Sequence, residues 1–285
     1  MKNYSSNELI KIGSSELQEA KISNTKFEAE LILSHLLKLP KEKLLLKPYQ
    51  VNELICSQFF SLIKKRKRHF PLQYIIGKWE FWSCSLLIEE GVFIPRPETE
   101  TLIEMCIENF HSDKTTFIDL GTGTGNIAIA LANEFTKAQI LAIDISKKAL
   151  SIAKKNIELN NLKNRINLIQ SNFLPAINYK ALKQPIIIVS NPPYISTEEI
   201  PTLPDEIRLY EPPESYIAGN NGLDCYFTII QQLSKWNIKP IYIIFEITPI
   251  LLPKIISFAK KKKFQCKKIK KDLLNLARAL LLEKI

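Results

Sequence analysis

The tetrapeptide Asn191-Pro192-Pro193-Tyr194, here called the ledge, has the residue types needed to hold a planar amino group. Two consecutive prolines fix their own φ angles at about −65° and bias Asn191 towards an extended backbone. An amide oxygen and a free backbone carbonyl can accept the two hydrogens of an NH₂ group while an aromatic ring covers its plane. Taken alone, the ledge is also compatible with a plain proline-rich turn after a strand.

A glycine-rich loop forms the second group of candidate functional residues. The apolar run Thr116–Leu120 leads into Gly121-Thr122-Gly123-Thr124-Gly125, and a helix is expected from Asn126. Glycines at such a turn let the backbone approach a ligand closely and open a helix N-terminus towards it. Asp144 ends the next expected strand, where an acidic side chain can bind both hydroxyls of a ribose. No Gly-Lys-Ser/Thr follows the loop, which excludes a triphosphate cradle.

The arrangement Asp119-x-Gly121-x-Gly123 resembles the loop of S-adenosylmethionine-dependent methyltransferases. In that resemblance Asp119 and the loop face the methionine part of the cofactor, Asp144 binds the ribose and Phe173 packs on the adenine ring. Asn172 stands where these enzymes often have Asp, and its carbonyl can still accept from the adenine amino group. The cofactor-binding residues expected in this way are Asp119, Gly121, Thr122, Gly123, Thr124, Gly125, Asp144, Phe173 and Asn191. From the residues alone, Asp119 could instead only cap the turn.

Strand-like and helix-like stretches alternate after Thr115, which predicts an α/β fold with a doubly wound, mostly parallel sheet. Strands are expected at Thr116–Leu120, Gln139–Asp144, Ile166–Gln170, Pro185–Ser190, Ile241–Glu246 and Leu280–Lys284. Helices are expected at Ile127–Glu134, Lys148–Asn160 and Tyr226–Trp236. A further helix from Glu100 to Phe110 has an acidic first turn, and we expect Thr99 to cap it.

The region before this sheet divides into two parts. Apolar residues at helical spacing predict a small helical domain over residues 1–78. An aromatic-rich hairpin is expected within residues 79–98, which leaves 99–285 for the catalytic domain.

Composition narrows the protein class. The five cysteines show no Cys-x-x-Cys spacing, so we expect neither a disulfide framework nor a metal site. A signal core and a membrane span are both lacking, which predicts a cytoplasmic protein. The net charge of +10 gathers partly in Lys64–Arg68 and Lys260–Lys271. Such clusters fit either solvated faces or a polyanionic partner.

The motifs together resemble those of the bacterial release factor glutamine methyltransferases. The resemblance rests on Pro71–Trp82, Phe93–Glu100, Gly121–Gly125, the ledge, Glu211-Pro212 and Gly219-x-x-Gly222-Leu223. It implies a Rossmann-like, seven-stranded methyltransferase sheet, S-adenosylmethionine as methyl donor, and a helical domain that docks the protein substrate. That substrate would be the glutamine of the Gly-Gly-Gln motif in class 1 peptide chain release factors, methylated at N5. We expect a monomer that forms no stable nucleic-acid complex.

The ledge is then expected to act on the substrate amide. Asn191 and Pro192 accept its two hydrogens, Pro193 keeps the backbone stiff, and Tyr194 packs over the amide plane; Asn191, Pro192 and Tyr194 are the expected catalytic residues. Ribosomal-protein glutamine methyltransferases share the ledge but typically lack the Arg-Pro-Glu-Thr-Glu run. A nucleobase-amine methyltransferase and a non-catalytic binding module remain as further alternatives.

The chain departs from the family pattern near its end. Thr248 and Leu251 replace a usual Gly and Gln, and no Gly stands near Asn275. We expect these positions to lie on the far side of the sheet, away from the ledge.

Overall fold

The structure, a computed structural model, describes residues 4–111, 114–174 and 177–285. The chain forms two compact units. The helical unit contains the chain up to Lys78 together with Pro204–Tyr210, and the sheet unit contains Trp79–Leu203 and Glu211–Ile285. The return of Pro204–Tyr210 to the helical unit was not predicted from the sequence.

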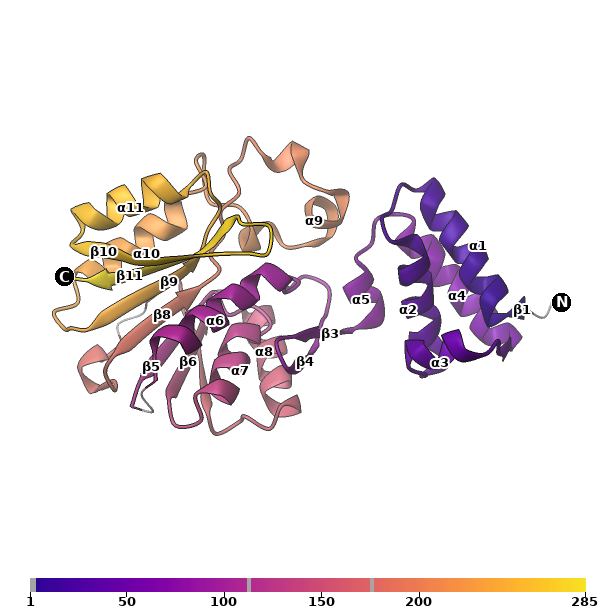
Figure 1. The fold of residues 1–285 in the computed structure, drawn as a ribbon, viewed down its shortest axis with the longest axis horizontal. Coiled ribbons are helices and arrows are strands. Elements are labelled where there is room, and N and C mark those ends of the chain that lie inside the picture. Colours follow the sequence, from indigo (N-terminus) through magenta and orange to yellow (C-terminus); the bar gives the residue numbers. More distant parts are fainter. Residues whose placement is uncertain (1–3, 112–113, 175–176) are drawn as a thin grey trace. The chain divides into compact units, whose positions relative to one another are not determined.

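The sheet unit is built on a seven-stranded sheet in the described part of the chain, with strand order β10-β11-β9-β8-β5-β6-β7 (Figure 1). Its parallel strands are β5 (Thr116–Leu120), β6 (Gln139–Asp144), β7 (Ile166–Gln170), β8 (Ile186–Ser190) and β9 (Ile241–Glu246). Two antiparallel strands, β10 (Phe264–Lys271) and β11 (Ala277–Lys284), complete the sheet beside β9. The predicted α/β fold with a mostly parallel sheet is confirmed.

Helices cover both faces of this sheet (Figure 1). One face carries α6 (Glu100–Asn109), α7 (Asn126–Glu134) and α8 (Lys147–Leu159), and the other carries α10 (Asp224–Ser234) and α11 (Leu252–Lys261). Coverage on both faces explains why the central strands are continuous apolar runs without polar alternation. Short 3-10 turns occur at Pro97–Thr99, Tyr179–Ala181, Ile200–Thr202 and Pro213–Ser215.

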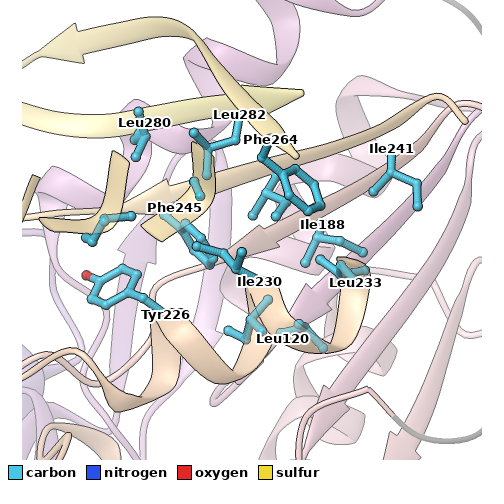
Figure 2. Close-up of a cluster of buried hydrophobic side chains, with 14 of the residues drawn as sticks. Leu120, Ile188, Tyr226, Ile230, Leu233, Ile241, Phe245, Phe264, Leu280 and Leu282 are labelled. Carbon is cyan, nitrogen blue, oxygen red and sulfur yellow. The ribbon is translucent and has the colours of Figure 1, made fainter. Parts of the chain in front are cut away.

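A hydrophobic core lies between the sheet and the helices α10 and α11 (Figure 2). Leu120, Ile188 and Phe245 face it from β5, β8 and β9. Tyr226 of α10 is fully buried there, and its hydroxyl donates to the backbone carbonyl of Glu246 at 2.8 Å. This hydrogen bond fixes the carboxyl end of β9 to α10.

The hairpin that precedes the sheet consists of β3 (Lys78–Phe81) and β4 (Cys84–Leu87). Asn156 of α8, which is fully buried, binds it to the glycine loop Gly121–Gly125. Its Nδ2 donates to the carbonyls of Leu87 (3.1 Å) and Thr124 (2.9 Å), and its Oδ1 accepts from the Leu87 N–H at 2.6 Å. The side-chain amide of Asn156 therefore connects β4 to the glycine loop.

The prediction that Thr99 caps α6 is wrong. Thr99 already has helical backbone angles (φ −64°, ψ −21°) and makes no side-chain cap bond. Its hydroxyl instead donates to the Glu246 carboxylate at 2.6 Å. Local capping chemistry has been overridden by a partner 147 positions away in the chain.

The helical unit contains α1 (Ser6–Glu19), α2 (Thr25–Leu37), α3 (Lys41–Leu46), α4 (Glu53–Arg66), α5 (Leu72–Ile76) and α9 (Asp205–Tyr210), with the short strands β1 (Tyr4–Ser5) and β2 (Gln50–Val51). Arg66 is buried in this unit. Its guanidinium binds Glu28 at 2.6 and 3.0 Å and Glu206 of α9 at 2.6 Å. Tyr210 adds a bond from its hydroxyl to the carbonyl of Arg68 at 2.8 Å.

The two basic clusters are partly neutralised inside the fold. Lys67 contacts Glu16 and Glu19, and Arg66 is the buried residue just described. In the second cluster, Lys268 and Lys270 of the edge strand β10 both contact Glu108. Lysines on an edge strand also discourage pairing with another chain. These contacts favour the interpretation of the clusters as solvated faces.

Candidate active site

The glycine loop connects β5 to α7 at the carboxyl edge of the sheet. Gly121, Gly123 and Gly125 all have positive φ angles (74°, 55° and 84°). A Cβ on Gly125 would lie 3.3 Å from the Cβ of Ala153 in α8, so the helices pack closely here. The turn that opens α7 towards the cavity therefore depends on glycine.

Asp119, the penultimate residue of β5, is fully buried beneath the loop. Its Oδ2 accepts from the Thr122 hydroxyl at 2.6 Å and from the Ala128 N–H at 3.1 Å. Its Oδ1 is buried and has no hydrogen-bond partner among the described residues. Burial raises the pKa of Asp119 to about 7. Asp119 does cap the turn, but only one of its two oxygens is used for that purpose.

Asp144, the last residue of β6, lines the same cavity. Its Oδ2 accepts from the Gly123 N–H at 2.8 Å, and its Oδ1 accepts from the Ser146 N–H at 2.9 Å. Burial raises its pKa, and these backbone hydrogen bonds oppose the rise. A carboxylate oxygen has more than one acceptor site, so Asp144 can still bind ligand hydroxyls.

Phe173 follows β7 and lines the cavity together with Asn172. Phe173 has a φ of +59°, which is unusual for an aromatic residue and marks a locally constrained backbone. The next residue, Leu174, is held by its N–H, which donates to Gln232 of α10 at 3.1 Å.

Asn191 stands at the end of β8, where Ser190 donates to the carbonyl of Leu120 at 2.7 Å and thereby joins the ends of β8 and β5. The Asn191 Nδ2 donates to the Thr99 hydroxyl oxygen at 3.2 Å. None of the described residues donates to the Asn191 Oδ1 or to the Pro192 carbonyl. Both acceptors that the sequence assigned to a substrate amide are therefore available.

Tyr194 completes the ledge, and burial raises the pKa of its phenol to about 12. Gly222 holds it from the opposite segment, because a Cβ on Gly222 would lie 2.3 Å from the Tyr194 carbonyl oxygen. The following residues pair with this segment, since Ile195 donates to the carbonyl of Tyr216 and accepts from Ala218, both at 2.8 Å. The ledge is thus fixed at both of its ends.

The segment before α6 is joined to the site by an ion pair. Arg96 contacts the Glu211 carboxylate, which also accepts from the Ile94 N–H at 3.3 Å. Burial raises the pKa of Tyr194, and the charges of Arg96 and Arg278 partly oppose that rise. The expectation that the atypical positions near the end of the chain lie away from the ledge is wrong for Leu251, whose Cδ1 is 3.5 Å from the same Gly222 Cβ position that meets the Tyr194 carbonyl.

These residues surround one cavity of about 320 Å³. Of the predicted site residues, Gly121–Thr124, Asp144, Phe173, Asn191 and Pro193 line it. Asp119, Gly125, Pro192 and Tyr194 are not among its lining residues. The sequence analysis did not assign Glu246 or Asn156 to the site; it named Thr99 only as a helix cap and Glu211 only as a motif residue of the family. The one local signal was Glu246, an acid that ends an otherwise apolar strand.

Charge is distributed unevenly around this cavity. Two acids, Asp144 and Glu214, are among its described lining residues, and none of those residues is Lys, Arg or His. Such a lining favours a cationic ligand over a phosphate-bearing one. Within the described ranges, no group of three or more His, Cys, Asp or Glu side chains is placed to hold a metal ion.

The sheet and this cavity define the class: the protein is an S-adenosylmethionine-dependent methyltransferase. The family description "Methyltransferase small domain" matches residues 86–203, and "PrmC N-terminal domain" matches residues 8–77. The release factor glutamine methyltransferase of Thermodesulfovibrio yellowstonii is 36% identical over 262 residues, 90% of this chain and 92% of that one. The chain belongs to the release factor glutamine methyltransferase family.

Further relatives agree with this membership. The release factor glutamine methyltransferase of Buchnera aphidicola subsp. Schizaphis graminum is 38% identical over 252 residues, 87% of this chain and 89% of that one. Among solved structures, the hMettl16 catalytic domain in complex with an RNA hairpin aligns with a TM-score of 0.53 and 18% identity over 69% of this chain and 74% of that one. This last likeness concerns the fold alone.

The residues of the site fit the cofactor of this class. A sulfonium with a ribose and an adenine, but no phosphate, suits a cavity with acidic residues, an aromatic ring and no lining cation. The unpartnered, buried Oδ1 of Asp119 adds an acceptor under the loop.

In the described part of the chain, no helix is long and apolar enough to cross a membrane.

Proposed function

We propose that this enzyme methylates the side-chain amide nitrogen (N5) of the glutamine in the Gly-Gly-Gln motif of class 1 peptide chain release factors. The relatives' names support the substrate, and the free Oδ1 of Asn191 supports the chemistry. Asn191 lines the cavity, and none of the described residues donates to its oxygen, which therefore stays available to a substrate.

The ledge positions a weak nucleophile. An amide nitrogen attacks poorly because its lone pair is delocalised into the carbonyl, so orientation dominates the barrier. Asn191 Oδ1 and the Pro192 carbonyl accept the two amide hydrogens, and they stabilise positive charge as it develops on nitrogen. Tyr194 packs over the amide plane and excludes water from it.

The bound cofactor supplies an activated methyl group on a positively charged sulfur. Asp144 would bind its ribose hydroxyls, and Phe173 would cover its adenine ring, since both residues line the cavity. Asp119 and the glycine loop face its methionine part. The amide proton leaves after transfer, when the methylated nitrogen is strongly acidic, so no basic side chain is required at the ledge.

The helical unit is proposed to dock the release factor, with the enzyme acting as a monomer in the cytoplasm, where translation ends. Lysines of both basic clusters form ion pairs with neighbouring glutamates, so we propose no stable nucleic-acid complex.

Parallel incubations with methyl-labelled S-adenosylmethionine test the substrate. A purified release factor, a ribosomal protein and tRNA are each offered separately. Label is expected on the release factor only, at the Gly-Gly-Gln glutamine, and a release factor with that glutamine replaced by alanine should remain unlabelled. Label on the ribosomal protein or on tRNA alone would instead support the corresponding alternative.

A further inference from the structure

The most informative group outside the expected site is a chain of three side chains that ends at the ledge. Glu246 accepts from the Thr99 hydroxyl at 2.6 Å, and the Thr99 oxygen accepts from the Asn191 Nδ2 at 3.2 Å. Thr99 and Glu246 are both buried, and they come from the segment before α6 and from the end of β9.

The chemistry of these groups gives the chain a direction. An ionised carboxylate only accepts hydrogen bonds, so the single hydroxyl hydrogen of Thr99 must point to Glu246. The Thr99 oxygen can then only accept from Asn191, which turns the asparagine NH₂ towards Thr99. The Asn191 oxygen consequently faces the cavity.

We propose that Thr99 and Glu246 are positioning residues that fix which end of the Asn191 amide meets the substrate. The proposal rests on the proposed function, because a substrate amide that offers two hydrogens needs an acceptor at this place. If the direction of these two hydrogen bonds were reversed, Asn191 would present its own NH₂ to the substrate NH₂. Two hydrogen-bond donors would then face one another.

Protonation of Glu246 is the event that permits this reversal. A neutral Glu246 can donate to the Thr99 oxygen, which frees the Thr99 hydrogen for the Asn191 oxygen. Burial raises the pKa of Glu246 to about 7; Glu98 adds to the rise, and Thr99, Arg278 and Arg96 oppose it. Tyr194 and Tyr226, the other titratable groups whose electrostatics involve Glu246, have pKa values raised further by its charge. Turnover should therefore fall as the pH decreases through about 7.

The test compares Thr99→Val, Thr99→Ser and Glu246→Gln with wild type. Valine keeps the shape of threonine and removes the hydroxyl, so kcat should fall about 10- to 100-fold while the KM for the release factor and the Kd for S-adenosylmethionine stay within about twofold. Serine should restore most of kcat. Glu246→Gln should lower kcat and abolish the loss of turnover between pH 8 and pH 6.

Thr101→Val is the matched control. Thr101 lies two positions away and is equally a buried threonine, but its hydroxyl donates to the Glu98 carbonyl at 2.7 Å and does not reach the ledge. It should keep wild-type kcat. Wild-type kcat in Thr99→Val, or an equal loss in Thr101→Val, would overturn the proposal.

A readout without turnover separates this proposal from the proposed function. The side-chain NH₂ signals of Asn191, measured by ¹⁵N–¹H NMR and assigned with Asn191→Asp, should shift with the titration of Glu246 in wild type and not in Thr99→Val. Absence of that shift in wild type would refute the network even if the release factor is methylated. Its presence would support the network even if the release factor is not the substrate.

Discussion

An asparagine can offer a substrate either its oxygen or its nitrogen, and at Asn191 the neighbouring Thr99 makes that choice. The free oxygen faces the cavity with no described partner of its own. Deleting it removes an acceptor that matters most as charge develops on the reacting nitrogen.

We therefore expect Asn191→Ala to lower kcat by about 10²–10³-fold, the scale for loss of one transition-state contact. S-adenosylmethionine binding, measured by isothermal titration calorimetry, should weaken much less. Asn164→Ala, at an exposed asparagine of the same unit, serves as control and should leave kcat unchanged. Wild-type turnover in Asn191→Ala would contradict the proposed role.

Asp119 gives the protein without cofactor a pH-dependent stability. Its pKa is raised from 3.8 to about 7, chiefly by burial, so the folded state binds its proton more tightly than the unfolded chain does. The stability that this contributes is present below about pH 4 and is lost as the pH rises through about 7. For one group the slope cannot exceed about 1.4 kcal/mol per pH unit.

The corresponding experiment follows the melting temperatures of wild type and Asp119→Asn from pH 5 to pH 8. Wild type should lose stability relative to Asp119→Asn as the pH rises, whatever the offset between the two proteins. A constant difference across this range would show that Asp119 does not change its protonation state there.

At the scale of elements, the ledge depends on a segment that is distant in sequence. Gly222 has a φ of +68°, and the Tyr194 carbonyl occupies the place where its side chain would be. Alanine there meets both a strained backbone, which costs about 1–3 kcal/mol, and a displaced ledge. We expect Gly222→Ala to lose stability and, in addition, at least about tenfold in kcat.

Gly77→Ala separates these two effects. Gly77 has nearly the same φ, +71°, but no atom lies within 4 Å of the Cβ position. It should show the loss of thermal stability with kcat within about twofold of wild type. Equal kcat losses in the two variants would mean that the close approach at Tyr194 is unimportant.

How far the sequence predicts an element depends on whether its signal is local. The parallel strands β5, β6, β8 and β9 were predicted because burial on both faces leaves short apolar runs, and β7, at the edge of the sheet, was predicted from its apolar residues although only Ile166 is buried. Strand β10 was missed, since its lysines were interpreted as part of a basic cluster and not as an edge strand. Asn275, where a glycine was expected, does adopt the positive φ of 63° that glycine would favour.

For the site, too, the sequence predicts the residues that have a local signal and misses those that depend on contacts between distant segments. The glycine loop, Asp144 and the ledge follow strand ends, so their positions could be derived from the sheet. Thr99 was assigned to a helix cap because it precedes an acidic turn, which is the usual local pattern. Its true partner, Glu246, becomes adjacent only after the sheet has formed, so no local rule could identify it.

At the scale of the whole molecule, one buried arginine organises the helical unit. Arg66 binds Glu28 and Glu206, and its side chain is 3% exposed. Removing it leaves Glu28 buried without its cation. Arg66→Ala is expected to destabilise the protein by about 3–5 kcal/mol, as is typical when one partner of a buried pair is removed.

Urea unfolding of the full chain measures this effect. Arg208→Ala is the comparison, because Arg208 pairs with Asp205 on the exposed side of α9, where an ion pair contributes about 0–1 kcal/mol. Similar midpoints for the two variants would show that the Arg66 cluster does not stabilise the helical unit.

The six residues of α9 also restrict how this protein can be rearranged. The chain passes between the two units after Lys78, returns for Pro204–Tyr210, and leaves again, so a single cut cannot separate them. A fragment that starts at Trp79 would carry Glu206 and Tyr210 without Arg66 and Phe70, their partners. Gene fusion or recombination at residue 78 would likewise separate α9 from the rest of the helical unit. Any rearrangement that separates the two units therefore also separates Glu206 from Arg66 and Tyr210 from Phe70.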